Sequence, residues 1–333
     1  MRGSDSGVRL SRRTVLAGGA GLAAVACVAG GYELVHNGTL PGRYKLARLT
    51  GACELAPAPL AGPLPSRHQV SFHSRYRHRN VQMVTLIPAA AASPAGLGVV
   101  IALHGSGGSP ATLAPGMARA MSRAHVTRFA IICVDGGETY WHQRADGDDP
   151  AGMIAHEVLP RAAAAGMHTG RIGIVGLSMG GYGALLIAEQ FSAEQPGTVR
   201  FRTKRQGTEQ LRAAGEPGGS PAVAAVAALS PAVFASYDDA RAANPGAFDS
   251  PADFTRNNVV AGLFTLRRVP AFIACGTDDP FQPEAALVRS RLSALTHHPV
   301  PGGIMPGCHD GSFWARHWPA ALEFVGAHQS GGF

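Results

Sequence analysis

Lysine is almost absent from this sequence of 333 residues, in which Lys45 and Lys204 are the only two. Arginine supplies nearly all of the remaining positive charge, and 29 basic residues against 22 acidic ones give a net charge of +7. Residues 1–31 hold four of the arginines and one aspartate. Without them, 25 basic residues (29 less 4) and 21 acidic residues (22 less 1) remain, a net charge of +4. Such a small excess argues against a nucleic-acid-binding protein.

Several common sequence signals are also missing. The sequence contains no internal repeat and no C-x-x-C or Cys/His spacing that would indicate a metal site. It contains neither G-x-G-x-x-G nor G-x-x-x-x-G-K-[ST], the usual nucleotide-binding loops. We therefore expect no metal and no cofactor.

What is present fits a globular protein. Hydrophobic residues make up 46% of the chain and charged residues 15%, which allows a sizeable core and argues against intrinsic disorder. The 43 glycines and 24 prolines are spread along the chain, as in a fold with many turns. The length fits one large domain, or one domain with appendages.

The N-terminal segment, residues 1–31, has the pattern of an export signal. From Ser11 the chain reads SRRTVLAGGAGLAAVACVAGG, which resembles the twin-arginine form S-R-R-x-hydrophobic-L, with Leu16 in the last position. The apolar run at 14–28 is shorter than the ~20 residues of a spanning helix. We expect export, and an extracellular or envelope-associated protein. The alternative is an amphipathic helix that stays on the protein.

The fate of this segment is open. No clean A-x-A cleavage site precedes an obvious mature start. The stretch AVAC ending at Cys27 is a poor lipidation signal, because Ala24 stands where Leu is preferred. Cleaved, lipidated and anchored forms are all compatible with the sequence, and the last two would associate the protein with the membrane or envelope.

Five cysteines fall into three contexts. Cys27 lies in the N-terminal segment. Cys133 and Cys275 lie within apolar, strand-like runs and are expected to be buried thiols. Cys53 and Cys308 lie in loop-like contexts and could pair in an oxidising compartment.

The rest of the chain alternates between apolar runs and helical stretches, after a proline-rich lead-in at residues 32–74. The apolar runs predict strands at 81–88, 96–105, 127–137, 171–178, 222–231 and 269–279. Helices are predicted at 115–125, 150–165, 180–191, 284–295 and 312–328, the last kinked or split by Pro319. The segment before His309 is too rich in Pro and Gly to predict a good last strand.

This alternation predicts a doubly wound, mostly parallel α/β sheet over residues 75–330. Ligands bind such sheets at the carboxyl ends of the strands. Two polar, turn-rich segments, about 192–221 and 236–258, interrupt the alternation and are predicted to be insertions. The second is expected to cap the functional site, with a solvated loop as the alternative.

The stretch VGLSMGGYG, residues 175–183, places Ser178 in a G-x-S-x-G motif between a predicted strand and a predicted helix. This is the context of a nucleophile elbow, a strained turn that exposes a serine hydroxyl. Gly176 and Gly180 would let the strand and helix backbones approach around it. We therefore expect Ser178 to be a nucleophile.

A serine nucleophile needs a base, and the base needs an orienting carboxylate. The expected chain order is Ser, acid, His. FIACGTDDPF offers Asp279 as the acid, with Asp278 as the alternative. The later histidines are His297, His298, His309, His317 and His328. His309 is favoured as the base, because it lies in a Gly-bounded turn before the last helix.

An oxyanion hole requires two backbone N–H groups. Met179 follows the nucleophile and supplies the first. The turn ALHGSGGS, which follows an apolar strand, supplies the second from Ser106, with Gly105 as the alternative.

With these pieces in place, the chain resembles the esterase branch of the α/β-hydrolases. It is similar to the esterase D and mycolyltransferase group, and most of all to exported actinobacterial esterases. The resemblance spans about residues 74–327 and rests on five stretches: HGSGG, VDGGETYWHQRADGDDPAGM, GLSMGGYGALL, CGTDDPF and GCHDGSFW. It implies a catalytic triad of Ser178, Asp279 and His309, no cofactor and no metal.

The same resemblance implies that Tyr140, Trp141 and His142 wall the substrate pocket, with core packing as the alternative. Two features depart from the group: the long insertion after the elbow helix, and the weak last strand. Some relatives use Glu as the triad acid.

We therefore expect a serine esterase that acts on a small-molecule or lipid ester through an acyl-enzyme on Ser178. An acyltransferase that passes the acyl group to a sugar or lipid hydroxyl is the alternative within enzymes. A non-catalytic envelope protein that binds lipid or glycan is the alternative outside them, although a binding protein has no need of all three triad residues. Peptidase activity is disfavoured, because no propeller-like domain is present.

Export through the paired arginines is testable. Arg12→Lys together with Arg13→Lys should stop delivery to the cell envelope, because the motif requires the arginine pair. Fractionation of cells that express the double variant, compared with the unchanged chain, measures this. Equal delivery of both proteins would contradict the export hypothesis.

Overall fold

The computed structural model describes Cys53 and residues 59–193 and 221–329. Residues 54–333 form a compact unit of their own, and the fold described below is that of this unit. The predicted N-terminal signal, the lead-in up to residue 58 apart from Cys53, and most of the insertion at 192–221 lie outside the described residues.

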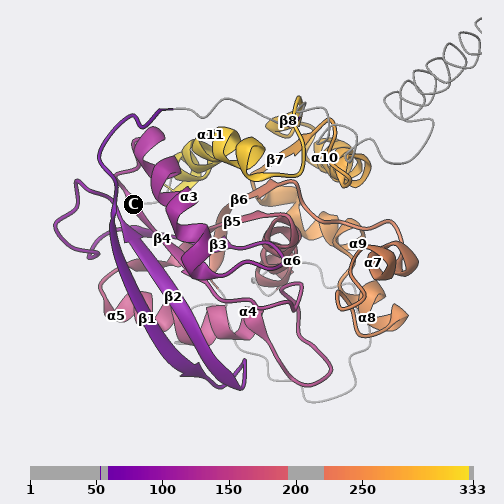
Figure 1. Cartoon of the computed structure of the whole chain (residues 1–333), viewed down its shortest axis with the longest axis horizontal. Coiled ribbons are helices and arrows are strands. Elements are labelled where there is room, and N and C mark those ends of the chain that lie inside the picture. The colour runs from indigo at the N-terminus through magenta and orange to yellow at the C-terminus, as the bar shows by residue number, and fades with distance from the viewer. Residues whose placement is uncertain (1–52, 54–58, 194–220, 330–333) are drawn as a thin grey trace, which may run out of the picture. The chain divides into compact units, whose positions relative to one another are not determined.

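The unit is built on an eight-stranded sheet with the order β1-β2-β4-β3-β5-β6-β7-β8 (Figure 1). The strands are β1 (Ser66–Ser74), β2 (Arg79–Ile87), β3 (Gly98–Leu103), β4 (Phe129–Val134), β5 (His168–Leu177), β6 (Ala222–Leu229), β7 (Ala271–Gly276) and β8 (Gly302–Met305). Strands β3 to β8 are mutually parallel, and β2 pairs antiparallel with both β1 and β4. The predicted doubly wound, mostly parallel sheet is confirmed.

Helices cover both faces of the sheet. They are α3 (Pro110–Arg123), α4 (Pro150–Met153), the π-helix η1 (Ile154–Val158), α5 (Leu159–Ala164), α6 (Met179–Ala193), α7 (Tyr237–Ala243), α8 (Pro251–Arg256), α9 (Val259–Gly262), the 3₁₀-helix η2 (Leu263–Arg268), α10 (Gln282–Thr296) and α11 (Gly311–Gln329). Helices α3 and α11 pack on one face, and α4 to α6 with α10 pack on the other.

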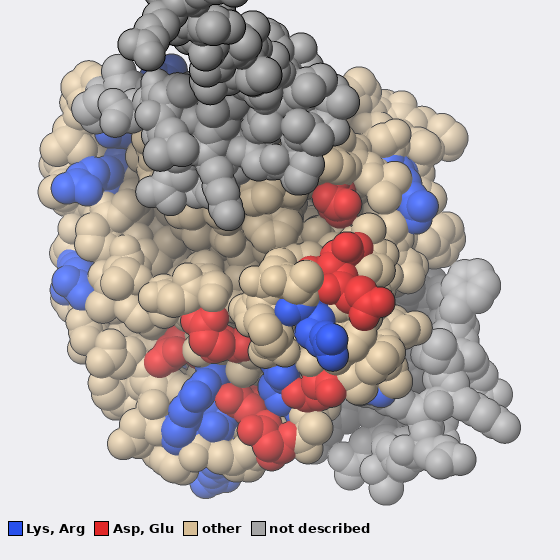
Figure 2. Space-filling view, turned by 45° about the vertical axis from the view of Figure 1, so that its right-hand side comes forward, with Lys and Arg blue, Asp and Glu red and all other residues tan. Residues whose placement is uncertain are grey.

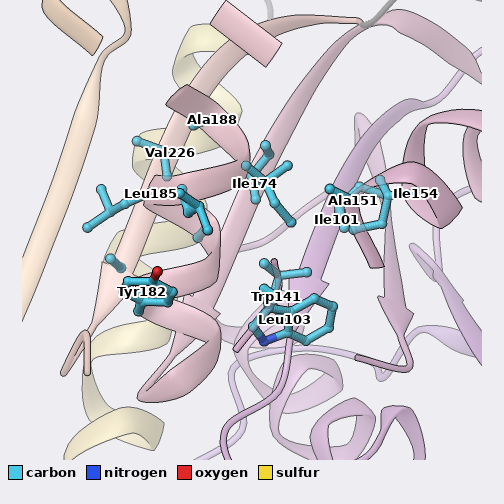
Figure 3. Packing of buried hydrophobic residues seen from close by; sticks show 14 of the residues in the cluster. Ile101, Leu103, Trp141, Ala151, Ile154, Ile174, Tyr182, Leu185, Ala188 and Val226 are labelled. Carbon is cyan, nitrogen blue, oxygen red and sulfur yellow. The ribbon is translucent and has the colours of Figure 1, made fainter. Parts of the chain in front are cut away.

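Alternating residues along the strands pack on opposite faces of the sheet. Ile101 and Leu103 of β3 join the core under α6, while Val100 and Ala102 join the core under α3 and α11. Figure 3 shows the first of these cores, with α6 beside the sheet and Trp141 next to Leu103. Continuous apolar strands are what a sheet buried on both faces requires.

Some elements differ from the sequence prediction. Strand β1 lies inside the predicted lead-in, and β8 forms despite its glycines. Helix α3 starts five residues before the predicted residue 115, because Ser109 and Thr112 form a capping box. Helix α11 runs through Pro319 without a break, so the predicted split does not occur.

The predicted helix over 150–165 is capped by Asp149, as expected, but it contains one π-turn between α4 and α5. The described part of the second predicted insertion, 236–258, contains α7 and α8, which begin at the capping residues Ser236 and Ser250. It is therefore an ordered helical segment.

Cys133 and Cys275 are free and buried, as expected, and burial raises the pKa of the Cys133 thiol to about 12. Cys53 and Cys308 are each buried and disulfide-bonded.

The surface carries charge of both signs. On the face in Figure 2, Lys and Arg side chains are interspersed with Asp and Glu and form no single-signed patch. Within the part of the chain that the structure describes, no helix combines the length and the apolar character needed to cross a bilayer.

Candidate active site

Ser178 lies in the turn from β5 to α6, with a left-handed φ of 55°. The turn brings neighbouring backbone segments so close together that glycine is needed on both sides of the serine. A Cβ on Gly176 would lie 1.9 Å from the Gly180 carbonyl oxygen, and a Cβ on Gly180 would lie 2.2 Å from the Leu103 carbonyl oxygen. Both glycines are therefore required by close approach, as the elbow motif predicted.

Backbone hydrogen bonds hold the elbow against the neighbouring strand. The Ser178 N–H donates to the Leu229 carbonyl at 2.9 Å, at the end of β6. The Ser178 carbonyl accepts from the N–H groups of Tyr182 and Ala232, each at 3.0 Å. A serine held in this way keeps its strained backbone conformation.

Ser178, His309 and Asp279 form one chain of hydrogen bonds. His309 Nδ1 lies 2.9 Å from Asp279 Oδ2, and His309 Nε2 lies 2.9 Å from Ser178 Oγ. A carboxylate accepts only, so Nδ1–H donates to Asp279, which leaves Nε2 of the neutral ring to accept from the serine hydroxyl. The structure thus brings together the three residues that the sequence analysis selected.

The choice between the two aspartates follows from their contacts. The Asp279 carboxylate is buried, and its second oxygen accepts from the Phe281 N–H at 2.9 Å. The Asp278 carboxylate instead accepts from the Thr277 hydroxyl at 3.0 Å, and the Asp278 N–H donates to the Gly307 carbonyl. Asp278 therefore ties the turn after β7 to the loop that carries His309.

The other late histidines lie elsewhere. His297 ends α10 in a left-handed conformation, and His298 follows it at the surface. His317 packs on Phe313 within α11, where burial lowers the pKa of its ring. His328 lies near the end of the same helix, and its Nδ1 donates to the Phe324 carbonyl.

The turn after β3 lies against the elbow. A Cβ on Gly105 would be 3.2 Å from Ser178 Cβ. Among the described residues, the Ser106 N–H has no hydrogen-bond partner, which leaves it available to a ligand. Met179 is the first residue of α6, where N–H groups have no acceptor one turn earlier in the helix. These are the two amides expected to form an oxyanion hole.

One supporting residue was not predicted. The Glu138 carboxylate accepts from the Ser106 hydroxyl at 2.5 Å and from the Gly107 N–H at 2.6 Å. Both oxygens of one side chain thus hold two successive residues of the turn and leave the amide of Ser106 unused. No local pattern around Glu138 could have shown this, because the contact joins loops that follow two different strands.

A buried imidazole braces the same turn. His104 Nε2 accepts from the Gly136 N–H at 3.0 Å, so Nδ1 carries the proton and donates to the Gly105 carbonyl at 2.8 Å. Burial lowers the pKa of His104, which is consistent with a neutral ring. The ring connects the loop after β3 with the loop after β4.

The expectation that Tyr140, Trp141 and His142 wall a pocket is corrected. Tyr140 is 3% exposed, and Trp141 and His142 are fully buried. The Trp141 indole fills the space beside Gly183, where a Cβ would lie 2.3 Å from the ring, and its Nε1 donates to the His104 carbonyl. These three residues therefore pack in the core, the alternative reading of this stretch.

His142 also anchors the second insertion. Its Nε2–H donates to Asp253 Oδ2 in α8 at 3.0 Å, and its ring stacks on Phe248 at 5.1 Å. Burial would raise the pKa of Asp253, but hydrogen bonds from His142 and from the Asp249 amide outweigh it and lower the pKa to about 2. This buried hydrogen bond thus fixes α8 to the loop after β4.

Partly buried aromatic rings flank His309. The Phe281 ring lies 5.1 Å from the imidazole, and the Trp314 ring lies 5.2 Å from it in an edge-on arrangement. Trp314 Nε1 donates to the Ser230 hydroxyl at 3.0 Å, and Phe281 contacts Phe234. The sequence analysis did not select these rings, although both follow the triad residues closely in the chain.

What the candidate site offers is a hydroxyl, an imidazole, a buried carboxylate and two amides. This set suits nucleophilic attack on a carbonyl carbon.

No protein-family model matches the chain, and no curated protein matches it. Several solved structures do match the chain. An S-formylglutathione hydrolase from Agrobacterium tumefaciens has a TM-score of 0.58 and 14% identity, covering 82% of this chain and 98% of its own. FphF, a fluorophosphonate-binding serine hydrolase from Staphylococcus aureus, has a TM-score of 0.56 and 17% identity, covering 79% and 99%.

A ferulic acid esterase has a TM-score of 0.56 and 18% identity, covering 79% of this chain and 97% of its own. At identities this low, the likeness shows a shared fold. The chain has the α/β-hydrolase fold.

If Asp279 is the triad acid, substitution of Asp279 and of its neighbour Asp278 should have different effects on the reactivity of Ser178. Asp279→Asn should slow the reaction of Ser178 with a fluorophosphonate by about 10³-fold or more, because an amide no longer favours the reactive tautomer of His309. Asp278→Asn is the matched control and should label at nearly the rate of the unchanged protein. Equal labelling rates for the two variants would contradict the assignment.

Glu138 should act by holding the turn. Glu138→Ala should slow labelling of Ser178 by about tenfold to a hundredfold, less than the 10²–10³-fold typical of deleting an oxyanion donor. Glu138→Gln, which keeps a carbonyl acceptor for the Gly107 N–H, should recover most of the rate. Glu323→Ala, an exposed glutamate on α11, controls for loss of charge. A Glu138→Ala rate within twofold of this control would refute the role.

Proposed function

We propose that the protein is a serine hydrolase that cleaves carboxylic esters. The observation that carries this proposal is the continuous hydrogen-bond chain from Ser178 Oγ through His309 to Asp279 on a nucleophile elbow. The named activities of the solved structures with this fold, among them an S-formylglutathione hydrolase and a ferulic acid esterase, support the same class.

In the proposed reaction, Ser178 Oγ attacks the ester carbonyl carbon while its proton moves to His309 Nε2. The carbonyl oxygen becomes an oxyanion that accepts from the amides of Ser106 and Met179. The positive end of α6 favours the negative charge. Asp279 stabilises the imidazolium and keeps its orientation.

Collapse of the tetrahedral intermediate breaks the bond to the alcohol oxygen, which leaves with the proton from His309. The acyl-enzyme on Ser178 is then attacked by water, whose proton passes to His309 Nε2. The second tetrahedral intermediate releases a carboxylic acid and returns the proton to Ser178. His309 carries the proton in each step, and water is the only reactant besides the ester.

The surroundings of His309 support an apolar ester as substrate. Phe281 and Trp314 lie on two sides of the imidazole and are only partly buried. Short to medium acyl chains are the first expectation. The proposed export by the N-terminal arginine pair would put this reaction outside the cytoplasm.

Hydrolysis of nitrophenyl esters of graded acyl length tests the proposal. The unchanged protein should turn over these esters, and Ser178→Ala should lose about 10⁶-fold in kcat because no nucleophile remains. Ser71→Ala, an exposed serine on β1, is the matched control and should be fully active.

Turnover by Ser178→Ala near that of the control would refute the nucleophile. A folded protein that is labelled by a fluorophosphonate yet hydrolyses no ester would instead support acyl transfer, to be checked by adding a labelled sugar acceptor.

A further inference from the structure

A cleft lies between the end of β1 and the helices η1 and α5. It has a volume of about 540 Å³ and is lined by His73, Arg75, Tyr76, His156, Glu157 and Arg161. In Figure 1 this is the region where α4 and α5 pass behind β1 and β2. Three strands separate β1 from β5 in the sheet, so the cleft is roughly 20 Å from Ser178.

The acidic residue of the cleft is already engaged. Glu157 is buried, and its two carboxylate oxygens accept from the Ser74 hydroxyl at 2.5 Å and from the Arg75 N–H at 2.9 Å. Its role is therefore to fix the end of β1 against η1. The π-turn of η1 contributes both Glu157 and His156 to the cleft, and π-turns are frequent at functional sites.

The basic residues are left without acidic partners. Among the described residues, the Arg75 guanidinium makes no ion pair or hydrogen bond, and its side chain is exposed. The Arg161 guanidinium stacks on the Phe72 ring at 3.9 Å and donates one hydrogen bond to the Glu157 carbonyl, which holds it in place. Two guanidinium groups thus face the cleft. Among its lining residues, the one carboxylate is that of Glu157, which is already hydrogen-bonded to Ser74 and to the Arg75 backbone.

The rest of the lining suits an organic group. The rings of Tyr76 and His156 stack at 5.2 Å with an interplanar angle of 21°. The Tyr76 carbonyl accepts from the Asp149 N–H at 2.7 Å, which ties the Tyr76 backbone to the start of α4. The volume exceeds that of one inorganic anion and lies in the range of small-molecule sites.

We propose that this cleft binds a phosphorylated small molecule. Arg75 and Arg161 contact the phosphate oxygens, because a guanidinium fork matches this geometry and two such cations favour a dianion over a monoanion. The organic part lies against the Tyr76–His156 pair. Binding here uses none of the residues of the Ser178 site, so this inference does not depend on the proposed hydrolase activity.

Isothermal titration of the full chain with glucose 6-phosphate tests the proposal, with glucose and inorganic phosphate as comparison probes. Glucose 6-phosphate should bind, inorganic phosphate should bind more weakly, and glucose should not bind. Arg75→Gln should raise Kd about tenfold or more. Arg128→Gln, an exposed arginine outside the cleft, should leave Kd unchanged. Arg75 makes no side-chain contact that folding needs, so this variant should fold normally.

Two further variants separate the two halves of the site. Arg161→Lys keeps the charge but loses the fork, and should weaken glucose 6-phosphate and inorganic phosphate alike. Tyr76→Leu should weaken glucose 6-phosphate while leaving inorganic phosphate unchanged. Ser178→Ala should bind as the unchanged protein does, whether or not the protein is an esterase.

Three results would overturn the proposal. The first is no heat of binding for glucose 6-phosphate at millimolar concentration. The second is an equal loss of affinity in Arg75→Gln and Arg128→Gln, which would show general charge attraction. The third is inorganic phosphate binding as tightly as glucose 6-phosphate, which would leave the ring pair without a role.

Discussion

The candidate site depends on the close approach of three backbone segments around Ser178. The strand end at Gly176, the helix start at Gly180 and the turn at Gly105 come so near to one another that side chains would collide. This contact forces Ser178 into its left-handed conformation and places the first amide of α6 beside the turn after β3. The candidate nucleophile and the candidate oxyanion donors are thus positioned by one packing constraint, and strain of this kind is typical of functional sites.

The loop after β4 supports this arrangement from several directions. Through Glu138 and the Gly136 amide it holds the turn after β3, and through Trp141 it fills the space under α6. Through His142 it fixes α8, and through its contacts with Arg77 it holds the turn between β1 and β2. Residues that the sequence suggested as a pocket wall are therefore the support of the site.

The parts of the site that could be predicted are those with a local signature. Five consecutive residues, G-x-S-x-G, identify the elbow. Asp279 follows a predicted strand, and His309 lies in a Gly-bounded turn before the last predicted helix. The parts that were missed depend on contacts between distant segments. Glu138 acts on residues 31 and 32 positions away, and the burial of Trp141 depends on Gly183 in another element. Strand β1 was missed because it is exposed along most of its length, so it carries no apolar run.

The last strand shows why a weak sequence signal can still mark a necessary element. Glycines made residues 302–305 look unlike a strand, yet Gly302 has a φ of 96°, and a Cβ there would lie 2.1 Å from the Ile273 carbonyl oxygen. A larger residue would push β8 away from β7. Because the loop after β8 carries His309 and the loop after β7 carries Asp279, such a shift would open the hydrogen bond between them. The composition that weakens the strand prediction is thus what lets the imidazole reach its carboxylate.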